Sequence, residues 1–338
     1  VLNIASISSV FDKKLYKPLA PLSALLAVAF LIAGLIVLVL DLGKPDRLIV
    51  AMTTYNFKSI FSWNIFLYSG FAVVLIAYMW TMLDREVNKY SKYIGTFAFG
   101  WRIILTTGTG SIFGFLVARE AYATAILAPL FIVMSLLYGT AVYFLILKII
   151  SKFHETYISD EILMNLRRLT IMFLFANLYF LFLYHITNMY IAKHLDYEIF
   201  ILLDGGVYTF AFWIGQLLVG IIVPIFLINS QRISKELSLI VSSVLILLGS
   251  FVAMYVIIIA GQAYPLNIFP DHVIIESSFY DNTVHAYIPS IYELGLGLGG
   301  VALALIIVLI GVANFKFLPT IIKPPKTNIV DEQENITT

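Results

Sequence analysis

The stretch LVLDLGKPDRLIVAM, residues 38–52, shows the pattern that decides the fold. A run of aliphatic residues ends in Asp41, passes through a Gly, a Lys-Pro and an Asp-Arg pair, and becomes apolar again. Long apolar runs with short charged breaks continue in this way along the 338 residues. Each run reaches the roughly 20 residues that an α-helix needs to cross the hydrocarbon core of a bilayer. The pattern predicts helices embedded in a membrane.

Composition supports this interpretation, because 61% of the residues are hydrophobic and only 12% are charged. Soluble globular proteins carry about 25% charged residues. A barrel is excluded, since the ten-residue alternation of membrane strands is missing. We therefore expect an all-α, polytopic transmembrane bundle with eight complete spans. We place these spans at residues 18–40, 62–83, 93–118, 124–149, 168–191, 206–229, 237–261 and 292–314.

The two ends of the sequence are expected to differ from this bundle. The opening segment VLNIASISSVF resembles the last turns of a preceding helix that is only partly present, so residues 1–17 are interpreted as its end and a loop. Residues 18–314 form the transmembrane domain, and the polar residues 315–338 form a cytoplasmic tail.

The distribution of Lys and Arg predicts the orientation. If the side of residues 11–17 is named side X, its breaks hold fifteen basic residues, and the opposite side Y holds five. Basic residues accumulate on the cytoplasmic side of membrane proteins. We expect a cytoplasmic (inner) membrane protein with side X and the C-terminus in the cytoplasm. Side Y, which carries the long breaks 41–61 and 262–291, is expected to face outward and to meet a partner.

Several cofactors are disfavoured by the residues available. The chain has no Cys, so it supplies no thiolate for an iron–sulfur cluster or a zinc site. Of its five His, only His185 lies in a predicted span, and a buried b-type haem generally needs two facing His. No metal is predicted, because the acids and His of the long outer break match no compact ligand motif: Asp271, His272, Glu276, Asp281 and His285. The basic residues flank membrane segments, so no nucleic-acid partner is expected.

The span at 93–118 is unusual, since it mixes Gly, Thr and Arg102 into an apolar segment. Gly110 and Gly114 favour close helix packing, and Thr hydroxyls in such a helix bond back to its own backbone. A guanidinium at membrane depth is costly unless it faces protein or water, so Arg102 indicates an internal polar region or a side chain that reaches the surface. Gln216 and Gln262 either continue a polar pathway or join helices.

Five separated blocks then resemble the NrfD/polysulfide reductase membrane-subunit family. They begin with LDLGKPDR at 40–47 and NFKSIFSW at 56–63, and continue with GSIFGFLVARE at 110–120 and FWIGQLLVGIIVPIFL at 212–227. The last block, GQAYPLNIFP at 261–270 with YIPSIYELGLGLGGVALAL at 287–305, is similar to the quinone-linked membrane subunits of hydrogenase 2 and of the sulfite reductase-associated complex.

This resemblance implies a subunit that has no redox centre of its own and binds a quinone of the menaquinone or ubiquinone type near side Y. It also implies a ferredoxin-like iron–sulfur partner on the outer face. A further catalytic subunit, of the molybdenum, nickel–iron hydrogenase or sulfur-metabolism type, would process the soluble substrate. The whole complex would be a respiratory oxidoreductase.

Within this interpretation, Thr106, Thr107 and His185 are expected near the quinone headgroup, with Asp41 and Arg119 at the outer mouth. A His near the end of a span can transfer protons at physiological pH, or it can be a hydrogen-bonded structural residue, and both interpretations of His185 stay open.

Arg47 of the family's outer break, and Ser62 and Trp63 at the start of the next helix, are expected to be structural or partner-facing. Relatives often carry His or Tyr in place of Thr106, Glu in place of Gln216 and Arg in place of Met254, so this chain has fewer groups for a proton path.

Two other functions remain as alternatives. One is a transporter of a small solute or ion, with Arg102 and the Gly-rich helix along its path. The other is a membrane anchor that holds a partner without touching quinone.

Overall fold

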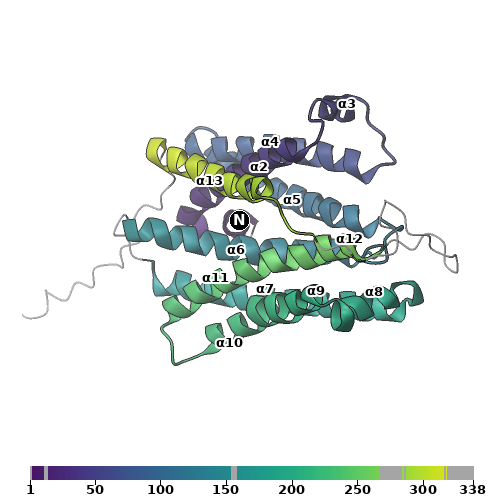
Figure 1. Ribbon diagram of the computed structural model, residues 1–338. Helices are drawn as coiled ribbons and strands as arrows, with labels where there is room; N and C mark the ends of the chain where they lie inside the picture. Colours follow the sequence, from purple (N-terminus) through teal and green to yellow (C-terminus); the bar gives the residue numbers. More distant parts are fainter. Residues whose placement is uncertain are drawn as a thin grey trace, which may run out of the picture.

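The computed structural model describes residues 2–10, 14–153, 158–265, 284, 287–315 and 317. Within these ranges the chain forms helices and no strands, which confirms the predicted all-α class. Long helices lie side by side in one bundle (Figure 1). The helices of four or more residues are α1 (Asn3–Val10), η1 (Lys14–Leu19), α2 (Ala20–Asp41), α3 (Arg47–Thr53), α4 (Ile60–Leu83), α5 (Ser91–Gly114), α6 (Leu127–Phe153), α7 (Asp160–Tyr190), α8 (Leu195–Ile199), η4 (Phe200–Asp204), α9 (Val207–Phe210), η5 (Ala211–Ile222), α10 (Val223–Asn229), α11 (Lys235–Met254), η6 (Tyr255–Ala260) and α13 (Ile291–Asn314). The three-residue elements are η2 (Asn88–Tyr90), η3 (Ala192–His194) and α12 (Gly261–Ala263).

A helix occupies each of the eight predicted span positions. In the described part of the chain, seven helical stretches are long and apolar enough to cross a membrane: Tyr16–Asp41, Ile60–Leu83, Leu127–Phe153, Asp160–Tyr190, Val207–Asn229, Lys235–Ala263 and Ile291–Asn314. α5 is not among them, although it has 24 residues, because its Gly, Thr and Arg residues lower its hydropathy. The chain is a multi-pass integral membrane protein.

The largest boundary difference is at the start of α7. The helix begins at Asp160, eight residues before the predicted start, and the Ser159 side chain accepts a hydrogen bond from the Ile162 amide. Hydropathy finds the apolar part of a helix, whereas capping sets its first residue. α5 instead ends early, at Gly114, where the backbone turns toward the connection that leads to α6.

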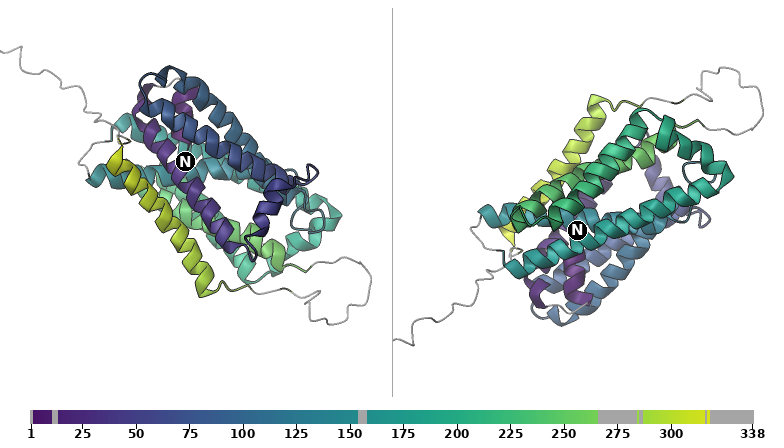
Figure 2. Two further views of the ribbon diagram at one scale, coloured as in Figure 1. Left: turned by 90° about the horizontal axis from the view of Figure 1, so that it is seen from above. Right: turned by 90° about the horizontal axis from the view of Figure 1, so that it is seen from below.

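Neighbouring helices pack in chain order through α4, α5, α6 and α7, while α11 packs on both α6 and η5. α13 lies along α2, far from it in sequence (Figures 1 and 2). The short helix α1 packs against α2, α5 and α6, and its neighbour Leu2 and its residues Ile4 and Ala5 are buried. Segment 2–10 therefore belongs to the interior of the bundle.

Glycine pairs allow two of the closest approaches. A Cβ placed on Gly220 of η5 would stand 2.9 Å from the Cα of Gly249 in α11. A Cβ on Gly110 of α5 would stand 2.7 Å from the Cα of Ala128, so α5 and α6 touch through their backbones as the sequence predicts. The hydrophobic effect does not drive helices together inside lipid. Small residues at such crossings instead allow close van der Waals packing between the helices.

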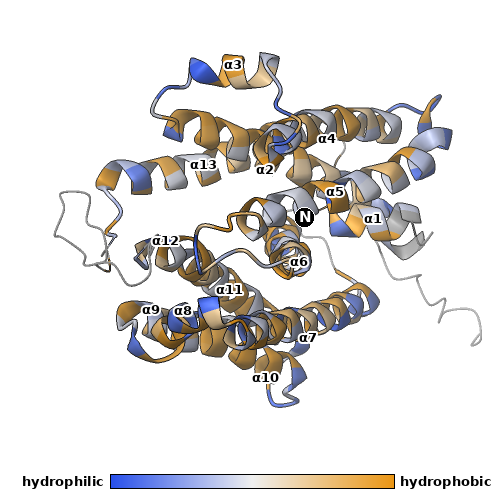
Figure 3. Cartoon of the chain, turned by 90° about the vertical axis from the view of Figure 1, so that its right-hand side faces the viewer, coloured by the Kyte–Doolittle hydropathy of each residue, from blue (hydrophilic) through white to orange (hydrophobic). Residues whose placement is uncertain are grey.

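The two sides of the bundle carry different links between helices. On side X, Lys148 near the end of α6 pairs with Glu236 at the start of α11. On side Y, Lys193 donates a hydrogen bond of 3.1 Å to the Val117 carbonyl. Hydrophobic residues run along the helices, and hydrophilic ones gather toward helix ends and connections (Figure 3).

Candidate functional site

A buried His–Glu hydrogen bond lies near the side Y end of α7. Nδ1 of His185 is 2.7 Å from Oε2 of Glu198, which belongs to the short helix α8. Glu198 is 1% exposed and His185 is 8% exposed. A carboxylate is held at such depth only when it is paired and hydrogen-bonded, because leaving water is costly for a charge. The turn of η3 at the end of α7 brings α8 back onto the bundle and so places Glu198 beside His185.

Two neighbours complete this group, which we name the His185 cluster: His185, Asn188, His194 and Glu198. The Asn188 amide donates to the second carboxylate oxygen of Glu198 at 2.9 Å. Nδ1 of His194 lies 3.3 Å from Oδ1 of Asn188. All four side chains are buried, and each is hydrogen-bonded to another member. The arrangement can hold a proton between His185 and Glu198, while Asn188 fixes the position of the Glu198 carboxyl group.

Rings enclose the cluster. His185 meets Phe212 of η5 edge-on with ring centroids 4.7 Å apart, and Tyr184 at 5.0 Å. The side chain of Tyr197, next to Glu198 in sequence, is buried and packs edge-on against Tyr264 at 5.5 Å. Burial, together with the nearby Glu198 carboxylate, raises the pKa of Tyr197 well above its usual value, so its hydroxyl keeps its proton.

The connection between α5 and α6, residues 115–126, ties three other parts of the chain together at side Y. Arg119 donates to the carbonyl of Gln262 at 2.8 Å and to that of Tyr264 at 3.3 Å. The Tyr122 hydroxyl lies 3.1 Å and 3.0 Å from the carbonyls of Ile257 and Ile258. These two carbonyls belong to η6, a π-helical stretch in which the backbone pattern leaves acceptors for side chains.

The same connection reaches α7, because the Tyr184 hydroxyl donates to the Ala121 carbonyl at 2.6 Å. Burial raises the pKa of Tyr122 to about 12, although the nearby Arg119 and a hydrogen bond with the Gln262 side chain act in the opposite direction. Tyr122 therefore remains a neutral donor at physiological pH.

A cavity of about 310 Å³ lies beside this connection. It is lined by Ile259, Gln262, Ala263 and Tyr287. The carbonyl of Tyr287 accepts a long hydrogen bond, 3.5 Å, from the Tyr255 hydroxyl. The cavity therefore combines small apolar walls with an amide and a phenol, and its Gln262 is bonded through Tyr122 and Arg119 to the connection described above.

Burial at side Y also shifts the pKa values of two titratable groups, Glu120 and His194. The pKa of Glu120 is raised by burial and by the neighbouring Asp196, while Lys193 opposes the shift. The pKa of His194 is lowered by burial and by Lys193, with Glu198 acting in the opposite direction. His194 is thus held neutral and serves Asn188 as a hydrogen-bond partner.

The predicted residues of α5 do not join this region through any hydrogen bond among the described residues. Thr106 donates to the Arg102 carbonyl at 2.9 Å and Thr107 to the Ile103 carbonyl at 2.8 Å, so both bond back to their own helix. Arg102 is buried, as expected for a guanidinium that faces protein: it donates to Asn3 and, at 3.3 Å, to Ser135. Its side chain thus links α5 to α1 and α6.

Both predicted outer-mouth residues lie near the Gln262 cavity. Arg119 bonds the Gln262 carbonyl, and Asp41, exposed at the end of α2, is close enough to the lining residue Tyr287 to act on it electrostatically. Arg47, at the start of the exposed helix α3, makes no ion pair with Asp41. Trp63 donates its indole N–H to the Phe57 carbonyl at 2.9 Å and thereby folds the segment before α4, with Ser62 beside it half-buried.

The two predicted amides have different surroundings. Gln216, in the π-helical η5, is buried, and its Oε1 has no hydrogen-bond partner among the described residues. Gln262 lines the cavity at side Y. Met254, the residue before η6, is half-buried. The outer-loop residues Asp271, His272, Glu276, Asp281 and His285, and the tail from residue 318 onward, lie outside the described residues.

Sequence reasoning does not select Glu198, Tyr122 or Tyr197. Glu198 stands in LDYEIF, where one acid is followed by the apolar run FILL, and this is the only local hint of its burial. Its pairing with His185 spans 13 residues and depends on the turn at η3. Tyr122 and Tyr197 are not part of any sequence motif or spacing pattern that would indicate their roles.

Comparisons with known proteins agree with this architecture. The family described as "Polysulphide reductase, NrfD" matches residues 1–265. A relative from Archaeoglobus fulgidus, the Hdr-like menaquinol oxidoreductase integral membrane subunit, is 27% identical over 321 residues, which cover 94% of this chain and 80% of the relative. A selenate reductase subunit from Mesobacillus selenatarsenatis is 23% identical over 294 residues, which cover 76% of this chain and 68% of that protein.

Proposed function

The chain belongs to the polysulphide reductase NrfD family, and on this basis we propose that it is the quinone-reactive membrane subunit of a respiratory oxidoreductase complex. It exchanges electrons between the quinone pool and an iron–sulfur partner at side Y. The named activities of the two relatives, a menaquinol oxidoreductase and a selenate reductase, support membership in such a complex. A menaquinone-type quinone is the first substrate to test.

The observation that carries the proposal is the convergence of the Gln262 cavity and the His185 cluster at one end of the bundle. A quinone ring needs an apolar slot with a hydrogen-bonding group for each carbonyl. Ile259 and Ala263 supply apolar walls, and Gln262 and Tyr287 supply an amide and a phenol. The residues therefore fit a quinone headgroup, and this assignment shifts the site from Thr106 and Thr107 toward Gln262.

A quinone that changes redox state takes up or releases two protons with two electrons, and the protein has to handle those protons. The hydrogen bond between Nδ1 of His185 and Oε2 of Glu198 joins an imidazole to a carboxyl group, two side-chain types that commonly transfer protons in proteins. Tyr197, adjacent to Glu198, contacts Tyr264, whose carbonyl is bonded to Arg119 beside the cavity. The cluster is thus joined to the cavity by packed polar and aromatic groups, and we assign it the role of proton acceptor and donor.

The partner is proposed to dock at side Y. The exposed segment that contains Asp41, Arg47 and α3 lies at this end of the molecule (Figure 1). Since this chain has no Cys, a ferredoxin-like subunit would carry the clusters and pass electrons to a catalytic subunit of the molybdenum, nickel–iron or sulfur-metabolism type. Side X and the C-terminus face the cytoplasm, and side Y faces outward from the inner membrane.

The test compares Glu198→Gln with Asp196→Asn in the complete complex, purified with its partners. Both residues lie in α8, but Asp196 is exposed and Glu198 is buried. Loss of a proton-transfer group lowers turnover by roughly 100-fold or more. We expect this loss for E198Q in quinol-linked electron transfer, and no change for D196N.

Reduction of the soluble substrate by an artificial dye, which bypasses the quinone, serves as the internal control and should stay unchanged in both variants. A third variant, Gln262→Leu, should raise the KM for quinol. The site would be rejected if E198Q and Q262L, tested as single variants, both turned over quinol as fast as the wild type. A complex that neither binds quinone nor uses it would reject the function and favour the anchor.

A further inference from the structure

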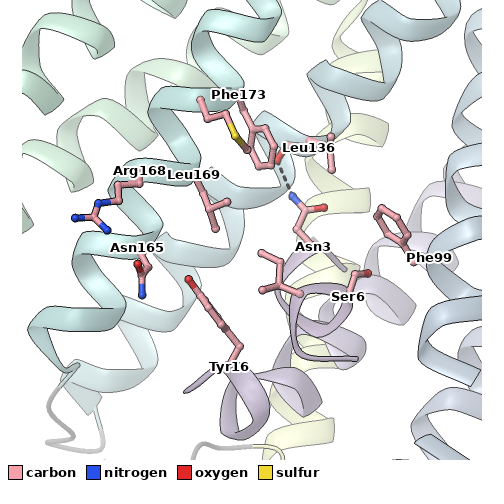
Figure 4. A pocket seen from close by; sticks show the side chains of 11 residues that line it. Asn3, Ser6, Tyr16, Phe99, Leu136, Asn165, Arg168, Leu169 and Phe173 are labelled. Atoms are coloured by element: carbon pink, nitrogen blue, oxygen red, sulfur yellow. Dashed lines mark hydrogen bonds between the residues drawn. The ribbon is translucent and has the colours of Figure 1, made fainter. Parts of the chain in front are cut away.

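A second cavity, of about 420 Å³, lies at the opposite end of the bundle, on side X. It is lined by residues of α1, by Tyr16 of η1, and by residues of α5, α6 and α7 (Figure 4). Its volume lies within the roughly 300–1,000 Å³ typical of small-molecule sites. It is unconnected with the quinone site proposed above. We propose that this cavity binds a membrane glycerophospholipid, with the phosphate at its polar rim and an acyl chain in its interior.

Two hydrogen-bond donors, the Tyr16 hydroxyl and the Asn165 amide, line the rim, and the exposed Arg168 begins beside them and extends its guanidinium outward. Figure 4 shows the Tyr16 hydroxyl directed toward Asn165, while the Arg168 side chain, on the same helix as Asn165, points away from the other lining side chains. None of the three makes a side-chain hydrogen bond or ion pair with another residue of the described ranges. An Arg with neighbouring OH and NH₂ donors matches the oxygens of a phosphodiester.

The interior of the cavity is largely apolar, with walls from Ile7, Phe99, Leu136, Leu169, Met172 and Phe173. Asn3 and Ser6 also line it, and both are already hydrogen-bonded, Asn3 to the Leu136 carbonyl and Thr140, and Ser6 to the Leu2 carbonyl. Arg168 and Met172 are exposed, so the cavity opens toward the surroundings of the bundle between α1 and α7. An amphiphile enters such an opening sideways from the bilayer, whereas a water-soluble phosphate would leave the apolar walls uncovered.

The depth of the rim also suits a lipid headgroup. α7 has 31 residues, which corresponds to about 46 Å at 1.5 Å per residue, while the hydrocarbon core is about 30 Å thick. If the helix is centred, about five of its first residues lie beyond the hydrocarbon, and Asn165 and Arg168 stand near the boundary. Basic pockets between transmembrane helices on the cytoplasmic side are known to hold acidic headgroups.

One acid bears on this rim. Glu161, one turn before Asn165, is close enough to Tyr16 to act on it electrostatically. It repels a phosphate and therefore limits the affinity. The proposal therefore makes two predictions of opposite sign. Removal of the Glu161 charge should strengthen lipid binding, whereas removal of the Arg168 charge should weaken it.

The test uses native mass spectrometry on the full chain, purified in detergent and supplied with phosphatidylglycerol. Arg168→Gln removes the charge, and Leu169→Trp fills the cavity while it keeps Arg168. Arg232→Gln removes an exposed cation on the same side, away from the cavity, and serves as the matched control. We expect lipid affinity to fall roughly tenfold in R168Q and in L169W, to rise severalfold in E161Q, and to stay unchanged in R232Q.

Three probes separate the possible ligands. Diacylglycerol, which lacks the phosphate, should bind at least roughly tenfold more weakly than phosphatidylglycerol, and inorganic phosphate should not displace the lipid. The proposal would be overturned if diacylglycerol bound as tightly as phosphatidylglycerol, or if inorganic phosphate displaced the lipid. It would also be overturned if added quinone bound to the cavity, that is, if quinone binding were lost in L169W but kept in R168Q. Thermal melting shows whether each variant is folded. If R168Q does not fold, the lipid affinity of L169W decides the question by itself.

Discussion

Gly249 of α11 lies directly against Gly220 of η5, with no side chain between the two backbones. A methyl group on Gly249 would overlap the Cα of Gly220, and backbone atoms do not move aside as the end of a flexible side chain can. This contact sets how close α11 comes to the π-helical segment that carries Gln216 and Phe212.

We therefore expect Gly249→Ala to destabilise the bundle by about 1–3 kcal/mol, the usual cost of overpacking. The matched control is Gly34→Ala in α2, where a Cβ meets nothing within 4 Å. Thermal unfolding in detergent, followed by size-exclusion chromatography, measures both. Equal melting temperatures for G249A and G34A would contradict the direct contact.

The buried Arg102 depends on Asn3, because no acid pairs with it among the described residues. Asn3→Leu leaves the guanidinium without its main acceptor and should destabilise by about 1–3 kcal/mol, since an unsatisfied buried polar group costs this much. Asn3→Leu combined with Arg102→Leu removes both partners, so it should be more stable than N3L alone. A strictly additive double variant in chemical unfolding would show that the two side chains are not coupled.

Tyr122 holds the π-helical stretch η6 through its hydroxyl, which bonds two carbonyls. Tyr122→Phe keeps the ring and loses the bonds, so we expect a loss of about 1 kcal/mol or somewhat more in stability. Tyr190→Phe is the control, since Tyr190 is 91% exposed. Hydrogen exchange of the amides near residues 257–262 should increase in Y122F and stay the same in Y190F.

The raised pKa of Glu120 predicts a dependence of stability on pH. The folded state favours the protonated carboxyl, so this contribution is fully present below the usual pKa of 4.5 and is lost as pH rises through the higher folded value. Glu120→Gln should remove this part of the pH dependence and stabilise the protein near pH 7. Melting curves between pH 4 and 8 test it, with Glu86→Gln, an exposed acid on side X, as the control. Parallel curves for E120Q and wild type would refute it.

Much of the fold can be predicted from the sequence, because hydropathy and length select helices with little ambiguity in lipid. The expected close packing at Gly110, and the Thr106 and Thr107 hydroxyls that bond back to α5, agree with the structure. Hydropathy places the start of α7 too late, since the first turns of this helix are helical but polar.

The site can be predicted only in part. The sequence leaves Arg102 either in an internal polar region or at the surface, and the structure buries it, with its partner Asn3 in a segment 99 residues away. His185 stands out because it is a rare residue in a span, whereas Glu198 looks like an ordinary acid in a break between helices. Only the backward turn at η3 makes that acid a buried partner, and no periodicity encodes such a turn.

The connection at 115–126 has a mechanical consequence. It grips α7 through Tyr184, the end of the α11 span through Arg119 and Tyr122, and residue 193 through Val117. In the complex proposed above, a partner that pressed on this segment at side Y would act on α7, on the end of the α11 span and on residue 193 together, including the carbonyl of Gln262. The connection would then couple the docking of that partner outside the membrane to the shape of the Gln262 cavity.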